Sequence, residues 1–436
     1  MKKTKRNGIY RPFFRLISVL AIILVSSAIL LSCSSGNPGD NTVQSGENGQ
    51  SPAPAAEESD SFTSNHEILD DYKNIEIGGT HDVRIMFVNA GKADSIIVEA
   101  DGLYYVIDTG EATSVPKINA SLEYMGADKI EAVFLTHSNN DHINGLYMLS
   151  ELWDIGACYT AAVSVSMQKI QIAIEKAGLV QTTLEPGSVI KISDGLYFEV
   201  LGPYEYNPLD ENANSLVMRF TVNGVTTLFT GDMQYDEEKT LMRAGFDLSC
   251  DILKIGHHGR KDATSVTFLD EASPKIAVIC TDREVDKSTA HKSVRSGLND
   301  KNVDTYITDE YDLGLLCVID ENGDIDLSDA EAPDNTLDIS IESISKEDQT
   351  VVIKNNDKST ADISRWYIIS ERGGEVFVFP DGTSIDGGGT LTVACSGYTR
   401  ESDLTWEDSR VWNRNKDDRG LLIDRYGSTV DSKNSK

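Results

Sequence analysis

The chain has 436 residues, of which 39 are basic and 70 acidic, so its formal net charge at pH 7 is −31. This length predicts two domains or more, and a hydrophobic fraction of 40% is enough for packed cores. A surface with this charge repels polyanions over long range, which excludes a broad nucleic-acid-binding face. Any phosphate chemistry would need a locally positive centre, for which a bound metal ion is the obvious source.

The first 33 residues have the pattern of a targeting signal. A basic stretch leads into Leu16 to Leu31, an uncharged run that is short for a spanning helix but typical of a secretory signal. The segment Leu30 to Cys33 resembles the lipobox of bacterial lipoproteins, in which the cysteine is lipidated. The resemblance implies lipidation of Cys33 and an extracytoplasmic protein anchored to the bacterial cell membrane. A plain signal-anchor helix is the alternative.

A flexible linker is predicted over residues 34–74. Between residues 34 and 61, Val43 is the only large aliphatic residue and no aromatic residue occurs. Such a segment cannot bury enough apolar surface to offset the entropy of ordering. It would hold the folded part away from the membrane.

Beyond the linker, β-type runs alternate with helical patterns. Val83 to Val88 and Leu103 to Ile107 are rich in Val, Ile and Tyr, as is usual for strands. Pro116 to Met125 has apolar residues at helical spacing and ends at Gly126. Strands that come first in runs and then alternate with helices predict an α/β layered domain over residues 75–325.

Candidate metal ligands follow the predicted strands. Five of the seven histidines lie at strand ends or in the loops after them: His137, His142, His257, His258 and His291. Asn139 and Asp141 lie in the first of these loops, and Asp232 follows another buried strand. Imidazole nitrogen and carboxylate oxygen suit zinc and other divalent ions, so the pattern predicts a metal site.

These segments resemble the metallo-β-lactamase fold, whose signature is H-x-H-x-D-H after a strand. Within it they are similar to the hydrolase type of bacterial competence proteins. The resemblance rests on six segments in the right order: Phe87 to Asp94, Val106 to Gly110, Leu201 to Pro203, Asn214 to Val217, Leu228 to Asp232 and Leu253 to Gly259. It implies an α/β fold built as a four-layer αββα sandwich, with the metal site at one edge of the sheets.

The chain departs from this signature at Asn139, which replaces the second histidine of the loop. Three roles for Asn139 stay open: a weak oxygen ligand, a hydrogen-bond partner of His137, or a sign of lost activity. Amide oxygens are poor zinc ligands but suit harder cations such as Mn²⁺. We therefore expect one firmly bound Zn or Mn ion and a weak second ion or none. The resemblance implies these metal ligands: His137, Asn139, Asp141, His142, Asp232, and His257 or His258.

Two side chains are candidates for catalysis. Asp141, facing the metal-activated water, is expected to orient it and to take its proton. His291 lies where the similar group has a histidine-rich loop, and it either donates to a phosphate oxygen or is an ordinary histidine at a helix start.

The end of the chain predicts a second domain. The acidic run from Glu321 to Asn335 indicates a linker, placed at residues 326–336. Residues 337–436 then show short strands broken by Gly and Asp turns, which predicts an all-β sandwich. Its Trp366 turn and the segment Phe379 to Thr383 resemble the lamin-tail domain. That resemblance implies an immunoglobulin-like module for attachment or recognition.

Two functions follow as hypotheses. The first is a surface-tethered, metal-dependent hydrolase of the phosphodiesterase or nuclease type, whose substrate is nucleic acid or a phosphate-containing envelope component. The second is a non-catalytic surface lipoprotein with a degraded hydrolase site, in which the lamin-tail domain binds a cell-surface partner. The surviving Asp and His ligands favour the first hypothesis, and the missing histidines favour the second.

Overall fold

The computed structural model describes residues 66–69, 78–398 and 401–436. The predicted signal peptide with Cys33, and most of the predicted linker 34–74, lie outside these residues. Across the three described ranges, no helix is long and apolar enough to cross a membrane.

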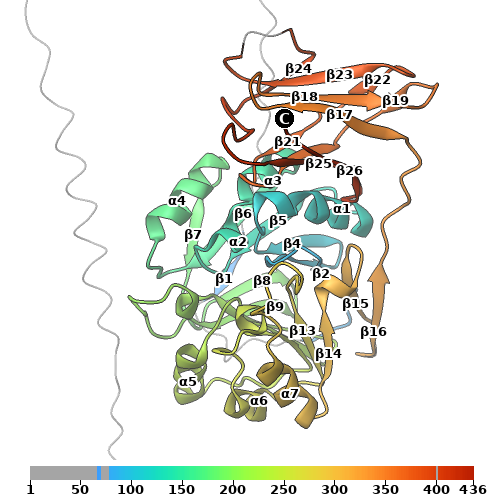
Figure 1. Ribbon diagram of the computed structural model, residues 1–436. Helices are drawn as coiled ribbons and strands as arrows, with labels where there is room; N and C mark the ends of the chain where they lie inside the picture. The colour runs from blue at the N-terminus through green and yellow to red at the C-terminus, as the bar shows by residue number, and fades with distance from the viewer. Residues whose placement is uncertain (1–65, 70–77, 399–400) are drawn as a thin grey trace, which may run out of the picture. The chain divides into compact units, whose positions relative to one another are not determined.

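The α/β domain contains two eight-stranded sheets (Figure 1). The first sheet has the strand order β1 (Ile68–Leu69), β8 (Val189–Ser193), β9 (Leu196–Gly202), β10 (Val217–Val222), β11 (Val225–Phe229), β12 (Ile252–Lys254), β13 (Ile276–Ile279), β14 (Asp304–Ile307). The second has the order β16 (Ile325–Ala330), β15 (Gly314–Ile319), β2 (Val83–Val88), β3 (Ile96–Ala100), β4 (Leu103–Ile107), β5 (Ile130–Leu135), β6 (Ile155–Ala161), β7 (Gln181–Leu184).

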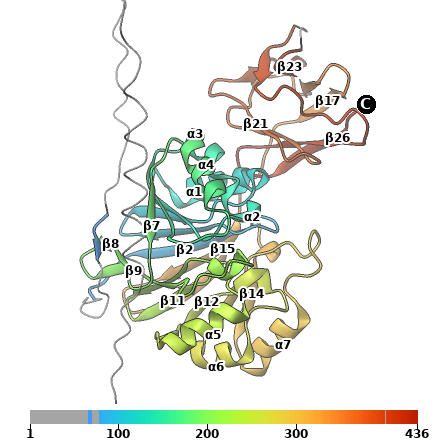
Figure 2. The same ribbon diagram turned by 90° about the vertical axis from the view of Figure 1, so that its left-hand side faces the viewer.

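Helices cover the outer faces of both sheets. The α-helices of the domain are α1 (Val115–Met125), α2 (Asn140–Ile143), α3 (Leu146–Leu152), α4 (Met167–Lys176), α5 (Tyr235–Ala244), α6 (Val266–Ala272) and α7 (Lys292–Asp300). Apolar residues of α5, α6 and α7 share one core with the first sheet, and those of α1, α3 and α4 share another with the second (Figure 2). The predicted four-layer αββα sandwich is confirmed.

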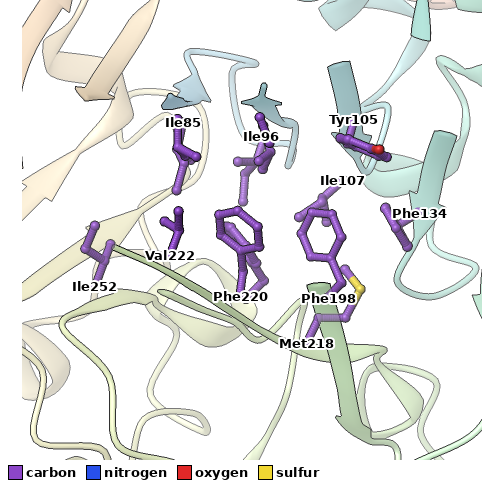
Figure 3. Packing of buried hydrophobic residues seen from close by; sticks show 14 of the residues in the cluster. Ile85, Ile96, Tyr105, Ile107, Phe134, Phe198, Met218, Phe220, Val222 and Ile252 are labelled. Atoms are coloured by element: carbon purple, nitrogen blue, oxygen red, sulfur yellow. The ribbon is translucent and has the colours of Figure 1, made fainter. Parts of the chain in front are cut away.

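The central core lies between the two sheets. Phe134 of one sheet meets Phe198 of the other with ring centroids 5.0 Å apart, and Phe198 meets Phe220 at 5.0 Å (Figure 3). Full burial of such a ring contributes roughly 1.5–3 kcal/mol. Strand β2 is buried on both faces, because Phe87 points into this core while Met86 packs toward the helices. This two-sided burial explains why the strands read as continuous apolar runs.

The strand directions determine where the ligand-bearing loops meet. Strands β4 to β7 are parallel to one another, and so are β11 to β14. The loops after β5, β11 and β12 therefore leave the carboxyl ends of parallel strands, which is where sites form in such sheets. These three loops carry His137 and His142, Asp232, and His258, respectively.

Two predicted linkers contain strands. Ile325 to Ala330 forms β16, antiparallel to β15, so the predicted linker 326–336 is wrong over its first five residues. Ile325 and Leu327 pack against the core between the sheets while Asp326 and Asp329 face solvent, and charges of this kind are usual on edge strands. At the other end, Ile68 and Leu69 pair with Ile190 and Val189, inside the predicted linker 34–74.

The second domain is all-β, as predicted. Trp366, Phe379, Trp406 and Trp412 are buried in its core. Its strands are β17 (Ile339–Ser345), β18 (Thr350–Asn355), β19 (Ala361–Asp362), β20 (Tyr367–Ser370), β21 (Val376–Val378), β22 (Ser384–Ile385), β23 (Thr390–Cys395), β24 (Leu404–Trp406), β25 (Arg419–Ile423) and β26 (Thr429–Asn434). Two four-stranded sheets, β17-β18-β23-β24 and β21-β20-β25-β26, form the sandwich.

Candidate metal centre

Three loops with constrained backbones carry the candidate ligands. His137 follows β5 directly, and His142 lies in the short helix α2. Gly231, beside Asp232, has a φ of 51°, and a Cβ there would lie 2.9 Å from the Thr136 Cβ, so the close approach of these two loops requires glycine. His258 lies in the 3-10 turn η5 (Gly256–Gly259), where both His257 and His258 have positive φ.

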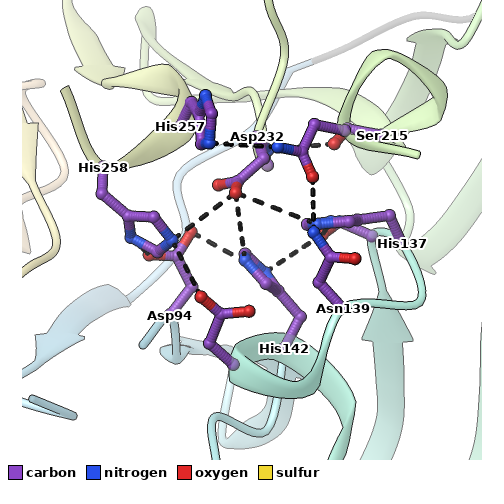
Figure 4. Close-up of polar contacts among 12 residues, drawn as sticks. Asp94, His137, Asn139, His142, Ser215, Asp232, His257 and His258 are labelled. Carbon is purple, nitrogen blue, oxygen red and sulfur yellow. Dashed lines mark hydrogen bonds and ion pairs between the residues drawn. The ribbon is translucent and has the colours of Figure 1, made fainter. Parts of the chain in front are cut away.

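The side chains converge on Asp232 (Figure 4). Its Oδ2 atom lies 3.4 Å from His142 Nε2, 3.5 Å from His258 Nε2 and 3.9 Å from His137 Nε2. Asp141 Oδ2 lies 3.6 Å from His258 Nε2. The three Nε2 atoms are buried and have no hydrogen-bond partner. Buried polar atoms without partners are costly, and here they all face one point.

Hydrogen bonds at Nδ1 determine which nitrogen of each ring is left for a ligand. His142 Nδ1 lies 2.7 Å from Asp108 Oδ2, and His258 Nδ1 lies 2.9 Å from the Cys280 carbonyl oxygen, so both nitrogens donate. Thr136 donates its hydroxyl proton to Asp108 and therefore accepts from His137 Nδ1 at 3.1 Å. Each Nε2 is left free for a proton or a metal ion, the arrangement found in metal sites.

Family comparisons agree with this geometry. Residues 88–282 match the Metallo-beta-lactamase superfamily, and residues 332–435 match the Lamin Tail Domain. The chain contains a metallo-beta-lactamase domain and a lamin tail domain.

Curated relatives indicate the competence-protein type. ComE operon protein 3 of Bacillus subtilis is 28% identical over 204 residues, covering 46% of this chain and 26% of the relative. Competence protein ComA of Neisseria gonorrhoeae is 27% identical over 202 residues, covering 44% and 26%. The chain thus matches about a quarter of the length of these relatives.

Solved structures with similar folds are more distant. A diphosphatase from the PhnP family shares 15% identity at a TM-score of 0.36, with 54% of this chain and 96% of that chain covered. Zn²⁺-bound PqqB from Methylobacterium extorquens shares 11% identity at a TM-score of 0.38, with 53% and 99% covered.

The metallo-beta-lactamase fold implies divalent metal binding, and the donors present fit such an ion. His137, His142 and Asp232 offer ligand atoms within 4.8 Å of one another, and so do Asp141, His142 and His258. Neutral imidazole and carboxylate are suitable donors for a divalent cation. The predicted set His137, Asp141, His142 and Asp232 is thus brought together.

His258, and not His257, lies with these donors. The His257 ring turns away, with Nδ1 3.0 Å from Asp262 Oδ1 and Nε2 accepting a hydrogen bond from Asn212 Nδ2 at 3.0 Å. Within the described residues, no group of potential ligands includes His257. Of the two histidines that the sequence left open, His258 is therefore the candidate metal ligand.

Asn139 lies at the centre but bonds to another amide. Its Nδ2 atom donates to Asn212 Oδ1 at 2.5 Å, and among the described residues its side chain makes no hydrogen bond to His137, which was one of the three roles left open. Asn214 forms hydrogen bonds within its own loop, at Asn207 and Asp210. Asn139, Asn212 and His257 thus form a hydrogen-bonded row, in which Asn212 accepts from Asn139 and donates to His257.

His291 lies apart from the metal ligands. It caps the start of α7, where Nδ1 accepts a hydrogen bond from the Ser293 backbone N–H at 3.2 Å. Its own backbone N–H donates to the Gly259 carbonyl oxygen at 2.8 Å. His291 thus lies at a helix start, and its predicted catalytic role stays a prediction.

Sequence reasoning assigned no role to three buried charged residues of the centre. Asp94 lies between His258, at 3.2 Å, and the ammonium group of Lys254, with which it forms an ion pair. Lys254 Nζ also donates to the Gly231 carbonyl oxygen at 2.8 Å, and Asp108 orients His142. Asp108 directly follows the predicted strand Leu103–Ile107, Asp94 lies just before β3, and Lys254 is a charge in the buried strand β12. These positions in the sequence were the signals that could have identified the three residues.

The electrostatics differ among the three histidines. Burial lowers the pKa of His258, but Asp232 and Asp94 outweigh burial and raise it to about 10. Burial likewise lowers the pKa of His142, and Asp232 and Asp108 raise it well above its usual value. Burial and the neighbouring His142 lower the pKa of His137 to about 3. Without a metal ion, His142 and His258 are therefore charged at pH 7 and His137 is neutral.

Proposed function

We propose that the protein is a metal-dependent hydrolase that cleaves phosphodiester bonds outside the cytoplasm. The observation that carries this proposal is the convergence of three unpartnered imidazole nitrogens on Asp232, beside the half-buried Asp141. A bound divalent ion supplies a positive charge that activates water and polarises a phosphoryl oxygen. In a chain with a net charge of −31, this centre is where an anionic substrate can be attracted.

Asp141 is the residue we expect to act on the water. Its side chain is 27% exposed, whereas those of His137, His142, His258 and Asp232 are at most 3% exposed. Burial raises the pKa of Asp141, but its hydrogen bond with His258 and the charge of His142 outweigh burial and hold the pKa below its usual value. Asp141 is therefore a carboxylate at neutral pH, able to orient a water molecule and to accept its proton.

The donor set favours one firmly bound ion. Asp141, His142, Asp232 and His258 provide nitrogen and oxygen donors that suit zinc or manganese. A second ion would have His137 and Asp232, while the amide of Asn139 is held by Asn212. We expect that ion to bind weakly or not at all.

The proposed function includes anchoring of the protein to the cell membrane. The apolar run Leu16 to Leu31 and the lipobox-like Cys33 support a lipoprotein anchored at the cell membrane. The substrate would then be extracellular nucleic acid or a phosphate-containing envelope component. The lamin tail domain would bind a cell-surface partner.

The test measures bound metal and hydrolysis on the same samples. The purified protein is loaded with Zn²⁺ or Mn²⁺, its metal content is determined by elemental analysis, and turnover of bis-p-nitrophenyl phosphate is followed. We expect about one equivalent of metal and measurable turnover. Asp232→Asn should lose both, whereas Asp236→Asn, which alters an exposed carboxylate in α5, should lose neither. A protein that takes up no metal would contradict the proposal.

A second candidate function is a non-catalytic binding lipoprotein. The specific observation in its favour is that Asn139, Asn212 and His257 bind one another where further metal ligands are needed. Metal uptake without turnover of any phosphodiester would favour this candidate.

A further inference from the structure

A cavity lined by four basic and three acidic side chains lies in the α/β domain, outside the candidate metal ligands. It has a volume of about 750 Å³ and is lined by side chains that include His291, Lys292 and Arg295 at the start of α7. Arg283 and Lys287 contribute two more cations from the loop after β13. This collection of cations stands out in a chain whose acidic residues outnumber the basic ones by 70 to 39.

Most charged side chains of the cavity already have a partner in the protein. Those without an acidic partner are available to bind a ligand. Arg283 makes a two-point contact with Asp309 at 2.8 and 2.6 Å, and Lys287 pairs with Glu284 at 3.0 Å. Asp282 Oδ1 accepts the backbone N–H groups of Glu284 and Val285.

Two cations of the cavity lack acidic partners. Over the part of the chain that the structure describes, Lys292 and Arg295 have no carboxylate within ion-pairing distance, and Arg295 Nε donates to the Ala290 carbonyl oxygen. His291 adds a third donor, because its Nδ1 accepts from the Ser293 backbone N–H and a ring proton therefore lies on Nε2. An ammonium, a guanidinium and an imidazole N–H are thus available together.

The cavity wall is joined to the metal ligands by backbone hydrogen bonds. The Ala290 N–H donates to the His258 carbonyl oxygen at 2.9 Å, and the His291 N–H donates to that of Gly259 at 2.8 Å. Arg260, just after the ligand loop, pairs with Asp286 of the cavity loop. The cavity is therefore held at a fixed distance from the metal centre, as a positioning subsite requires.

We propose that this cavity binds a second phosphate of the substrate, adjacent to the scissile one, through Lys292, Arg295 and His291. This inference rests on the proposed phosphodiesterase function and narrows its substrate to compounds that carry at least two neighbouring phosphates. Cations that face a phosphate form charge-assisted hydrogen bonds, which are stronger than neutral ones. His291 would then position the substrate, and the scissile bond would lie at Asp141.

The test compares dinucleotides that differ by one phosphate. Thymidylyl-thymidine and its 5′- and 3′-phosphorylated forms are assayed with the metal-loaded protein. We expect one phosphorylated form to have a KM about tenfold lower than the parent, which corresponds to about 1.4 kcal/mol. The double variant Lys292→Ala/Arg295→Ala should lose this preference because its KM for the phosphorylated form rises. Its kcat for that form should change far less. Lys275→Ala removes an exposed cation before β13, at the other end of that strand, and should keep the preference.

A binding measurement separates failure of the inference from failure of the proposed function. The Kd of thymidine 3′,5′-bisphosphate is measured with the metal-free protein and should rise about tenfold or more in the double variant. If the dinucleotides are not cleaved but this Kd still rises, the phosphate site stands and the hydrolase proposal fails. If they are cleaved with no preference, or the double variant keeps it, the inference is overturned. An unchanged Kd also overturns it.

Discussion

His257 and His258 are neighbours with opposite roles. Their φ values, 47° and 51°, are nearly the same, so replacing either by Ala imposes similar backbone strain. Only His258 directs its Nε2 toward Asp232 and Asp141. We expect His258→Ala to lose most of the bound metal and His257→Ala to keep it, as measured by elemental analysis of the loaded proteins. Equal loss in both variants would contradict the assignment.

The charged histidines predict that metal binding releases protons. His142 and His258 have raised pKa values and so hold a proton at pH 7, while His137 does not. A metal ion must displace these protons, so its affinity rises as the pH rises toward their pKa values. Calorimetric titration at pH 7 in two buffers with different ionisation enthalpies should show release of about two protons per ion. A binding heat that does not depend on the buffer would contradict this.

At the residue scale, the sequence identified the candidate ligands that lie in one loop or directly after a strand and that the structure brings together. His137, Asp141, His142 and Asp232 belong to such positions. Asp94 and Lys254 were missed because their role depends on which distant segments meet in space. His257 and His258 lie in a turn with left-handed backbone angles, and their side chains leave it in different directions. The spacing of residues in the sequence does not reveal these directions, so the choice between the two histidines could not be predicted.

At the scale of elements, strand and helix positions were predictable where apolar periodicity was strong. The expected strands at Val83–Val88 and Leu103–Ile107 form as predicted, and the helix expected at Pro116–Met125 forms as α1, Val115–Met125. Strand β16 was misread because its outward positions are acidic and its composition resembles that of a linker. Pairing with β15 provides the partner that local composition does not reveal.

The loop between β5 and α2 offers a test of the missing ligand. Asn139 is the N-cap of α2 but makes no capping hydrogen bond with its side chain, so replacing it leaves the helix start intact. Asn139→His would place a third strong donor near His137 and Asp232. We expect the zinc content after loading to rise from about one toward two equivalents.

Asn140→His is the matched control for this change. Asn140 is exposed and adjacent, so the added histidine should leave the zinc content unchanged. An equal rise in both variants would indicate adventitious binding to the new imidazole.

At the scale of the molecule, the candidate metal ligands come from both sheets. His137, Asp141 and His142 follow β5 of one sheet, whereas Asp232 and His258 follow β11 and β12 of the other. A metal ion held by both sets crosslinks the two halves of the sandwich and binds only the folded state. Its removal should therefore lower the stability of the α/β domain.

This coupling can be measured by thermal unfolding with and without a chelator. At a free metal concentration of 1,000 Kd the expected stabilisation is about 4.1 kcal/mol, which should raise the Tm by several degrees. Asp232→Asn should unfold at the same temperature under both conditions. A wild-type Tm that does not respond to the chelator would contradict the crosslink.

Lys254 forms an ion pair with Asp94 beside the candidate metal centre. The negative charge of Asp94 is thus balanced by a group that belongs to the chain. A chelator removes a metal ion but cannot remove this ammonium group, so Asp94 and the Gly231 carbonyl keep their partner in the apoprotein. The loops that hold Asp232 and His258 thus remain tied together while the centre is empty. The protein should for this reason lose and regain its ion repeatedly without refolding, a useful property in an environment where metal supply varies.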